Sequence, residues 1–220
     1  MNKRIKICFI FLVSFLFLSI AFSILLLTVD VRGSINNDRL GLATFNENVF
    51  YATGESKLWY VVTQIIGILA ILIVATFAVI GVIQLIKRKN LLKVDKEIIG
   101  LGIVYIIIGI IYLFFDKVVI INYRPVLEDG ELAASFPSSH TLLACVVLST
   151  CVLEAKKLIK ISFIKNYLIY LCEFLIIIMI GGRLLSGVHW ISDIIASVLY
   201  SGVIVSAYYL VMFYLDDKKK

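Results

Sequence analysis

The sequence predicts an all-α fold, a bundle of six transmembrane helices with both termini in the cytoplasm. Hydrophobic residues make up 61% of the 220 positions, and the mean hydropathy is +1.04. The apolar runs approach the roughly 20 residues with which a helix crosses a bilayer. They are continuous in Ile, Leu and Val, whereas the strands of a membrane barrel alternate apolar and polar residues. The pattern therefore excludes both a soluble globular protein and a barrel.

Six apolar runs separated by polar or charged residues define the predicted spans. They cover residues 8–29, 58–86, 98–115, 138–155, 167–182 and 191–215. The first run follows a basic start, as in a signal peptide, but it exceeds the usual core of about 7–15 residues and lacks a small-residue cleavage site, so we expect an uncleaved anchor. No repeat or Pro/Ser-rich linker divides the chain, and we expect a single integral-membrane domain over residues 1–220.

The distribution of basic residues predicts the orientation of the spans. Fifteen of the 21 Lys and Arg residues lie in the amino terminus, the carboxyl-terminal tail and the 87–97 and 154–166 loops. Because cytoplasmic loops are enriched in Lys and Arg, we expect both termini inside and the 30–57, 116–137 and 183–190 loops outside. Orientation thus accounts for the net charge of +6, and no nucleic acid partner is expected.

Three polar clusters stand at the outward ends of the predicted spans. They read K-V-V-I-I-N-Y-R-P over 117–125, P-S-S-H over 137–140 and R-L-L-S-G-V-H-W-I-S-D over 183–193. The two histidines of the chain, His140 and His189, belong to the second and third clusters. The 48 residues between them fit two spans joined by a basic loop, which returns the chain to the same face. We therefore expect all three clusters to meet there.

The first two clusters have features that suit a bound phosphate. Pro137, Ser138 and Ser139 stand where a loop becomes a helix, and the first amides of a helix are unpaired and attract anions. Either serine hydroxyl can donate a further hydrogen bond. Arg124 offers a planar fork to phosphate oxygens and Lys117 a point charge. A capped helix start and basic side chains that reach toward the lipid headgroups are the structural alternatives.

The third cluster adds a nucleophile. Asp193 lies four residues after His189, one turn along the same helix face, so its carboxylate can accept a proton from one ring nitrogen. The other nitrogen is then free to attack phosphorus, and Arg183 can bind the equatorial oxygens. A His–Asp pair that only braces a helix end is the alternative. The convergence of three clusters and both histidines on one face favours phosphoryl chemistry.

These clusters resemble the tripartite signature of the type 2 phosphatidic acid phosphatase family, K-x6-R-P, P-S-G-H and S-R-x5-H-x3-D. The first part is matched fully, while Ser139 replaces the glycine of the second part and Gly182 the serine of the third. The resemblance implies that His189 forms a phosphohistidine, that Asp193 orients it, and that His140 acts first as acid and then as base. It also implies a set of phosphate-binding residues drawn from all three parts, Lys117, Arg124, Ser138 and Arg183.

No metal or cofactor is expected to take part. The acids of the 116–137 loop, Glu128, Asp129 and Glu131, lack the spacing of a metal site and are interpreted as solvated. The 30–57 loop mixes apolar and aromatic residues with polar ones, which is typical of an interfacial segment beside a lipid entrance or of a plain aromatic belt.

The predicted function is metal-independent hydrolysis of a phospholipid or polyprenyl phosphate or diphosphate. Undecaprenyl diphosphate, phosphatidylglycerol phosphate and phosphatidate would suit the family, at the extracytoplasmic face of a bacterial plasma membrane. A phosphotransferase that moves the phosphoryl group to another lipid through the same site is one alternative. A non-catalytic lipid-binding or transport protein is another. The latter predicts polar residues along several spans, whereas Glu173 stands nearly alone at mid-span.

Overall fold

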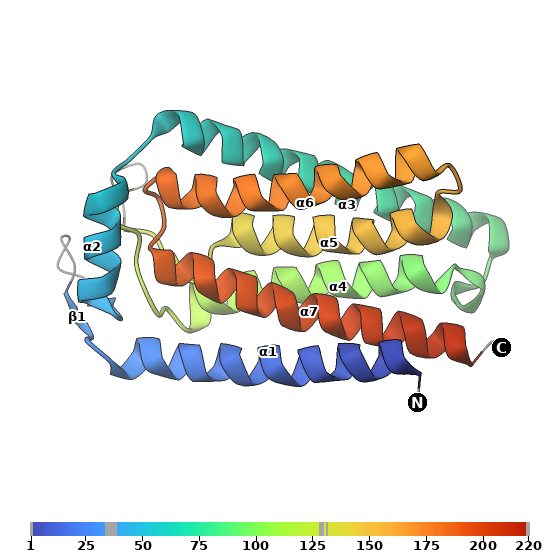
Figure 1. The fold of residues 1–220 in the computed structure, drawn as a ribbon, viewed down its shortest axis with the longest axis horizontal. Coiled ribbons are helices and arrows are strands. Elements are labelled where there is room, and N and C mark those ends of the chain that lie inside the picture. The colour runs from blue at the N-terminus through green and yellow to red at the C-terminus, as the bar shows by residue number, and fades with distance from the viewer. Residues whose placement is uncertain (1, 34–38, 128–129, 131, 219–220) are drawn as a thin grey trace.

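The computed structural model describes residues 2–33, 39–127, 130 and 132–218. Within these residues, six long helices run side by side as a bundle, and a shorter helix lies across one end of it (Figure 1). The helices are α1 (Lys3–Thr28), α2 (Ala43–Thr53), α3 (Lys57–Arg88), α4 (Lys96–Leu113), α5 (Ser139–Leu158), α6 (Ser162–Leu185) and α7 (Ile191–Asp217), of which α2 is the short one. The acidic residues Glu128, Asp129 and Glu131 of the predicted outer loop lie outside the described residues.

Shorter elements connect these helices. Between α1 and α2, strands β1 (Arg32–Gly33) and β2 (Arg39–Leu40) form an antiparallel pair in which Arg32 lies opposite Leu40. A 3₁₀ turn, Leu91–Lys93, joins α3 to α4, and a π-helical turn, Phe114–Val118, continues α4.

Each predicted span corresponds to one of the long helices. In the described part of the chain, α1, α3, α4, α6 and α7 are long and apolar enough to cross a membrane, α4 together with the π-helical turn. This finding confirms an all-α membrane fold. The remaining span, predicted at 138–155, forms α5, which packs against α3, α4, α6 and α7 and buries most of its residues. Because protein rather than lipid surrounds α5, it can carry more polar residues than its neighbours.

Both termini lie at one end of the bundle, and α2 covers the other (Figure 1). At the terminal end, the Asn2 side-chain amide donates a hydrogen bond to the Asp217 carboxylate at 3.2 Å. The opposite end, where α5 and α7 begin, carries the two histidines and is called the site end below. An even number of crossings would place both termini on one side of the membrane, as the charge distribution predicts.

Small side chains hold the start of α5 against α7. The Ser197 hydroxyl donates to the backbone carbonyl of Ser138 at 3.0 Å, and the Ser201 hydroxyl donates to that of Leu142 at 3.4 Å. Farther along, apolar residues of α4, α5 and α7 form the largest buried cluster, which includes Leu101, Val104, Leu142, Val146, Ile204 and Tyr208. The site end of α5 is therefore fixed by hydrogen bonds and its remainder by apolar packing.

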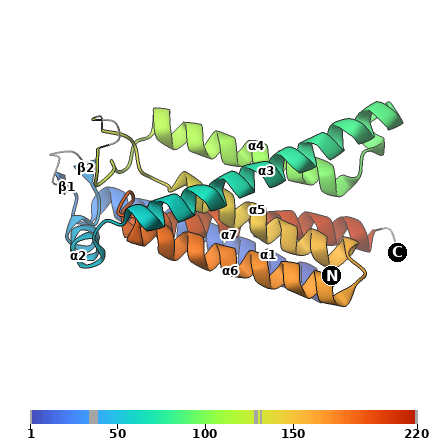
Figure 2. The same cartoon turned by 90° about the horizontal axis from the view of Figure 1, so that it is seen from above.

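Helix α3 runs obliquely to the rest of the bundle (Figure 2). Its first turns pack on α6, where a Cβ added at Gly182 would lie 2.8 Å from Thr63 Cγ2. Its last turns approach α4, where a Cβ added at Gly81 would lie 3.0 Å from Ile98 Cγ2. The seam between α3 and α4 therefore widens toward the site end.

Candidate active site

A cavity of about 570 Å³ opens at the site end between α3 and α4. Both histidines of the chain line it, together with Arg124 and Ser139. The remaining lining residues come from the apolar faces of α3 and α4, from Asp116 of the π-helical turn, from the loop that leads into α5 and from Leu143 of α5. The cavity thus has a polar end, formed by residues of the three sequence clusters, and an apolar wall formed mainly by α3 and α4. We refer to it as the site cavity.

His189 lies in the short turn between α6 and α7, where Gly187 adopts a positive φ of 70° that favours glycine. Its side chain is nearly inaccessible, at 3% exposure for the residue. Within the described part of the chain, neither ring nitrogen makes a hydrogen bond of normal geometry. A buried polar side chain that lines a cavity without a hydrogen bond of normal geometry is costly for folding, so it is a candidate for ligand binding or catalysis.

The surroundings of His189 keep its ring neutral. Burial lowers the pKa well below its ordinary value of about 6.5, and the nearby guanidinium groups of Arg183 and Arg124 lower it further. A contact with the backbone of Ser135 acts in the opposite direction and is the weakest of the four influences. The nitrogen lone pair that a nucleophile needs is therefore present at neutral pH.

Asp193 stands beside His189 and is fully buried. Its Oδ2 lies 3.8 Å from His189 Nδ1, slightly beyond hydrogen-bond distance, and accepts a bond from the Trp190 backbone N–H at 3.2 Å. Its Oδ1 accepts a hydrogen bond from the Asn122 side-chain amide at 2.9 Å. Both carboxylate oxygens are thus held in place, with Oδ2 directed toward the imidazole.

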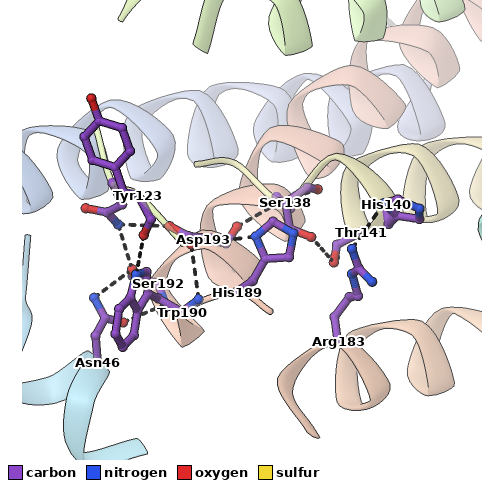
Figure 3. A network of polar contacts seen from close by, with 12 residues as sticks. Asn46, Tyr123, Ser138, His140, Thr141, Arg183, His189, Trp190, Ser192 and Asp193 are labelled. Atoms are coloured by element: carbon purple, nitrogen blue, oxygen red, sulfur yellow. Dashed lines mark hydrogen bonds and ion pairs between the residues drawn. The ribbon is translucent and has the colours of Figure 1, made fainter. Parts of the chain in front are cut away.

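Two asparagines that the sequence did not single out, Asn122 and Asn46, complete this support, and Figure 3 shows Asn46 beside Ser192. Asn122 accepts the backbone N–H of Gly41 at 3.0 Å while it holds Asp193. Asn46 of α2 donates to the Ser192 hydroxyl at 2.9 Å and accepts the Ser192 backbone N–H at 3.1 Å, which caps the start of α7. Through these bonds α2 and Gly41, which follows β2, are fastened to the segment that carries Asp193.

Arg183 is buried, at 1% exposure, and does not line the cavity, but it contacts His140, which does. Arg183 Nη2 lies 3.3 Å from His140 Nδ1, and a guanidinium can only donate hydrogen bonds. Nδ1 is therefore the acceptor, which leaves Nε2 as the protonated nitrogen of a neutral ring. On α3, the Thr63 hydroxyl accepts from Arg183 Nη1 at 3.2 Å, and the Tyr60 ring centroid lies 5.9 Å from the guanidinium carbon.

The close approach of α3 explains one departure from the family signature. A Cβ at Gly182 would lie 2.8 Å from Thr63 Cγ2 and 3.0 Å from Trp59 Cε3, so a serine there would collide with α3. Gly67 is similarly tight, because a Cβ at that position would lie 2.6 Å from the His140 ring. Residues of α3 therefore pack directly against both Arg183 and His140.

The remaining predicted residues take different places. Ser139 lines the cavity, whereas Ser138 is buried behind it, with its hydroxyl 3.0 Å from that of Thr141 and its backbone N–H bonded to the Asp193 carbonyl. Arg124 lines the cavity. Lys117 does not: its side chain is 75% exposed and pairs at 2.8 Å with Asp116, which does line the cavity. The structure therefore brings Arg124 and Ser139 to the site and leaves Lys117 at its rim.

The geometry suits phosphoryl transfer. A buried neutral imidazole is backed by a fixed carboxylate, a second imidazole lines the same cavity, and Arg124 and Arg183 supply positive charge close to both. No group of three or more His, Cys, Asp or Glu side chains suited to a metal ion occurs among the residues that the structure describes.

Comparison with known proteins assigns this arrangement to a family. The family model described as the PAP2 superfamily matches residues 101–217, the stretch that contains all of the predicted site residues. The crystal structure of a protein described as the first transmembrane PAP2 type phosphatidylglycerolphosphate phosphatase from Bacillus subtilis has the same fold, with a TM-score of 0.61. The match covers 95% of this chain and 97% of that one at 19% sequence identity. No protein of curated function matches the sequence.

Proposed function

The chain belongs to the PAP2 superfamily, and from this premise we propose that it is an integral-membrane phosphatase that hydrolyses a lipid phosphate or diphosphate through a phosphohistidine at His189. The observation that carries the proposal is the site cavity itself. It brings both histidines and Arg124 together at one end of an apolar seam between helices. A phosphate at the polar end would leave the hydrocarbon chain of its lipid along the apolar wall.

In the first step, His189 Nε2 attacks phosphorus and the bond from phosphorus to the leaving oxygen breaks. Asp193 accepts a hydrogen bond from Nδ1–H and stabilises the positive charge that develops on the ring. The anionic phosphate of the bound substrate favours a second proton on His140, and this imidazolium gives a proton to the leaving oxygen, so the lipid alcohol or lipid monophosphate departs neutral at that atom and His140 is left neutral. Arg124 and Arg183 hold the equatorial oxygens, on which the transition-state charge is spread.

In the second step, water attacks the phosphohistidine. His140 takes the proton of the water, the P–N bond breaks, and inorganic phosphate leaves with His189 restored. The Arg183 contact at His140 Nδ1 belongs to the neutral ring of the free site, so Arg183 must move onto the phosphate oxygens when His140 carries its second proton. The two histidines thus have separate tasks: one carries the phosphoryl group and the other moves protons.

We place the site on the extracytoplasmic side of a bacterial plasma membrane, in a six-span chain with cytoplasmic termini. Fifteen of the 21 basic residues support this orientation, because they lie in the termini and in the loops at the terminal end. Undecaprenyl diphosphate, phosphatidylglycerol phosphate and phosphatidate are the candidate substrates. The Bacillus subtilis protein of similar fold is described as a phosphatidylglycerolphosphate phosphatase, which supports the class and leaves the lipid to be measured.

The test is phosphate release by the purified protein in detergent with EDTA, on a panel of lipid phosphates and diphosphates. We expect release that survives chelation and is lost in His189→Ala. Retained turnover in that variant would overturn the nucleophile assignment, and a strict metal requirement would overturn the metal-independent mechanism. A phosphotransferase would instead pass labelled phosphate to an added lipid acceptor in preference to water.

A further inference from the structure

Thr63 of α3 is a fully buried polar residue that packs against the site, although it lies outside all three parts of the signature. The family match begins at residue 101 and so covers no residue of α3. Two residues of α3 nevertheless contact site residues of the matched region, because Thr63 bonds to Arg183 and Gly67 lies against the His140 ring. Thr63 and Gly67 are four residues apart, on one face of the helix. This face of α3 therefore belongs to the site.

The Thr63 hydroxyl meets Arg183 as a hydrogen-bond acceptor. Its own proton is donated to the α3 backbone, where the carbonyl oxygens of Trp59 and Tyr60 lie 3.0 and 2.9 Å away. A guanidinium can only donate, so Arg183 Nη1, at 3.2 Å, uses a lone pair of the same hydroxyl oxygen. Because the bond to the helix backbone holds the hydroxyl in place, its lone pair stays directed at Arg183.

The glycine that precedes Arg183 allows Thr63 to come this close. A Cβ at Gly182 would lie 2.8 Å from Thr63 Cγ2, so a larger residue there would push the threonine away. One turn earlier on α3, the Tyr60 ring has its centroid 5.9 Å from the guanidinium carbon. Helix α3 thus holds Arg183 with a hydroxyl and with an aromatic ring.

The two terminal nitrogens of Arg183 have different partners in the free site. Nη1 is bound to Thr63, and Nη2 lies 3.3 Å from His140 Nδ1. Arg183 does not line the site cavity, whereas His140 does. To hold a phosphate oxygen, Nη2 must therefore leave His140, while Nη1 can keep its partner. A guanidinium anchored at one nitrogen makes this exchange without losing both contacts.

Such an anchor matters because arginine is a long and flexible side chain. Fixing it costs rotamer entropy, and this cost weakens any contact that the guanidinium makes only in the transition state. A bond that is formed before the substrate arrives removes the cost from the reaction step. Thr63 provides this bond from α3, whereas Arg183 is carried by α6. The packing of α3 on α6 thus sets where the guanidinium lies.

We propose that Thr63 is a positioning residue of the reaction, which anchors Arg183 Nη1 while Nη2 passes from His140 Nδ1 to an equatorial phosphate oxygen as the substrate binds. This role rests on the proposed phosphatase function and adds to its site a residue from outside the signature. Once Nη2 has moved, His140 Nδ1 is available to take up from solvent the second proton that the acid step uses. Thr63 thus links binding of the phosphate to protonation of the acid.

The test compares Thr63→Val with the unaltered protein, because valine replaces only the hydroxyl, by a methyl group. Hydrolysis is measured in detergent on the lipid of the panel that is turned over fastest. Inhibition by orthovanadate is measured alongside, since vanadate adopts a five-coordinate geometry like that of the phosphoryl transition state. We expect kcat to fall about tenfold or more, with a change in KM of less than about threefold. The orthovanadate inhibition constant should rise by the same factor as kcat falls.

Two further variants serve as controls. Thr63→Ser keeps the hydroxyl and is expected to retain kcat and the orthovanadate constant within a factor of about three. Thr76→Val, at an exposed position of the same helix, removes a hydroxyl that bonds to the Leu72 carbonyl at 2.8 Å and is expected to change neither quantity. Melting temperatures of the variants in detergent report whether each one folds.

The outcomes separate the role of Thr63 from the phosphatase function. If the unaltered protein hydrolyses none of the lipids, the phosphatase proposal fails and the role of Thr63 fails with it. If hydrolysis occurs and Thr63→Val keeps its kcat, or loses kcat with an unchanged orthovanadate constant, Thr63 does not position Arg183 and only this role is overturned. A loss in Thr63→Ser as large as that in Thr63→Val would also overturn it, because the hydroxyl would then not be the group that matters.

Discussion

The two ends of the helix bundle both contain buried charged groups, but the groups are satisfied in different ways. At the terminal end, the buried Glu154 carboxylate accepts a hydrogen bond from the Tyr208 hydroxyl at 2.9 Å. Lys157 lies 3.3 Å from Glu97 and 3.1 Å from Asp216, and Lys96 also pairs with Asp216. Every charge in this terminal network has a partner in the protein.

The site end has a different balance. Asp193 is held by Asn122 and by the Trp190 backbone, yet the adjacent His189 ring makes no hydrogen bond of normal geometry within the described residues. Complete pairing of buried charge serves the fold, because an unpaired charge costs several kcal/mol of stability. A buried polar group that lines a cavity without a normal hydrogen bond, as His189 does, instead lowers stability but is available for catalysis. Changes at the two ends should therefore separate activity from stability.

The largest expected effect on activity follows from His189→Gln. The variant removes the nucleophile while keeping a polar side chain of similar size, so we expect kcat/KM to fall by at least about 10³-fold. Because the ring makes no normal hydrogen bond, the melting temperature in detergent should stay within a few degrees of that of the unaltered protein. A large loss of melting temperature would show that His189 is a structural residue and would remove the contrast between the two ends.

Asn122→Ala should come next. The variant deletes the donor to Asp193 Oδ1, and a hydrogen bond to a charged group contributes about 2 kcal/mol, which corresponds to roughly a 30-fold loss of kcat. KM should change little because Asn122 does not line the cavity. Asn46→Ala, one hydrogen bond farther from Asp193, should lose less. Equal losses in the two variants would indicate a general folding defect and no specific support of Asp193.

Tyr208→Phe tests the terminal end. It leaves the buried Glu154 carboxylate without its donor, and we expect the free energy of unfolding to fall by about 1–3 kcal/mol. The kcat/KM of the protein that remains folded should be unchanged. Tyr214→Phe, at an exposed position of the same helix, is the matched control and should alter neither quantity. A change in kcat/KM without a loss of stability would couple this end to the chemistry.

A titration of His189 measures directly how the surroundings at the site end change the pKa of one group. His140→Gln leaves His189 as the single histidine of the chain, so its ring signals can be followed by NMR against pH. Burial and the neighbouring arginines lower its pKa below 6.5, and the ring should therefore remain neutral as pH falls through that value. A midpoint at or above 6.5 would mean that the ring is solvated or paired with Asp193 as an imidazolium.

The smallest effect is expected for Lys117→Ala. Its exposed side chain pairs with Asp116 at the rim of the cavity, where water screens its charge, so we expect kcat/KM to fall by less than about fivefold. Arg124→Ala removes a guanidinium that lines the cavity and should cost more than tenfold. If the two variants lose the same activity, Lys117 must reach the phosphate during turnover.

The spans and the clusters could be predicted from sequence because their signals are local. Apolar runs end at charged residues, and four residues separate His189 from Asp193, although His189 lies in the turn before α7 and only Asp193 lies in its first turn. The hydrogen bond between Asn46 and Ser192 joins residues 146 positions apart, and no local pattern marks it. Asn122 carried a weak signal as a polar residue within an apolar run.

Burial was the least predictable property. Glu173 stands out in the sequence at mid-span, but the structure places it on the exposed face of α6, whereas Glu154 near the end of α5 is buried against Tyr208. Lys117 matches the family signature and lies at the rim. Gly182 departs from that signature because Trp59 and Thr63 of α3 occupy the space that a serine would need. Each outcome depends on how α3, α5 and α6 pack, which composition does not determine.

The most direct test of the central claim is to trap the phosphorylated protein during turnover. A radiolabelled lipid diphosphate is mixed with the protein, the reaction is quenched with alkali within milliseconds to seconds, and the label is mapped by mass spectrometry of the peptides. Phosphohistidine survives alkali and is lost in acid, so we expect alkali-stable label on His189 and none in His189→Gln. Label on another residue, or rapid turnover in which no phosphoprotein forms at any time, would contradict the account.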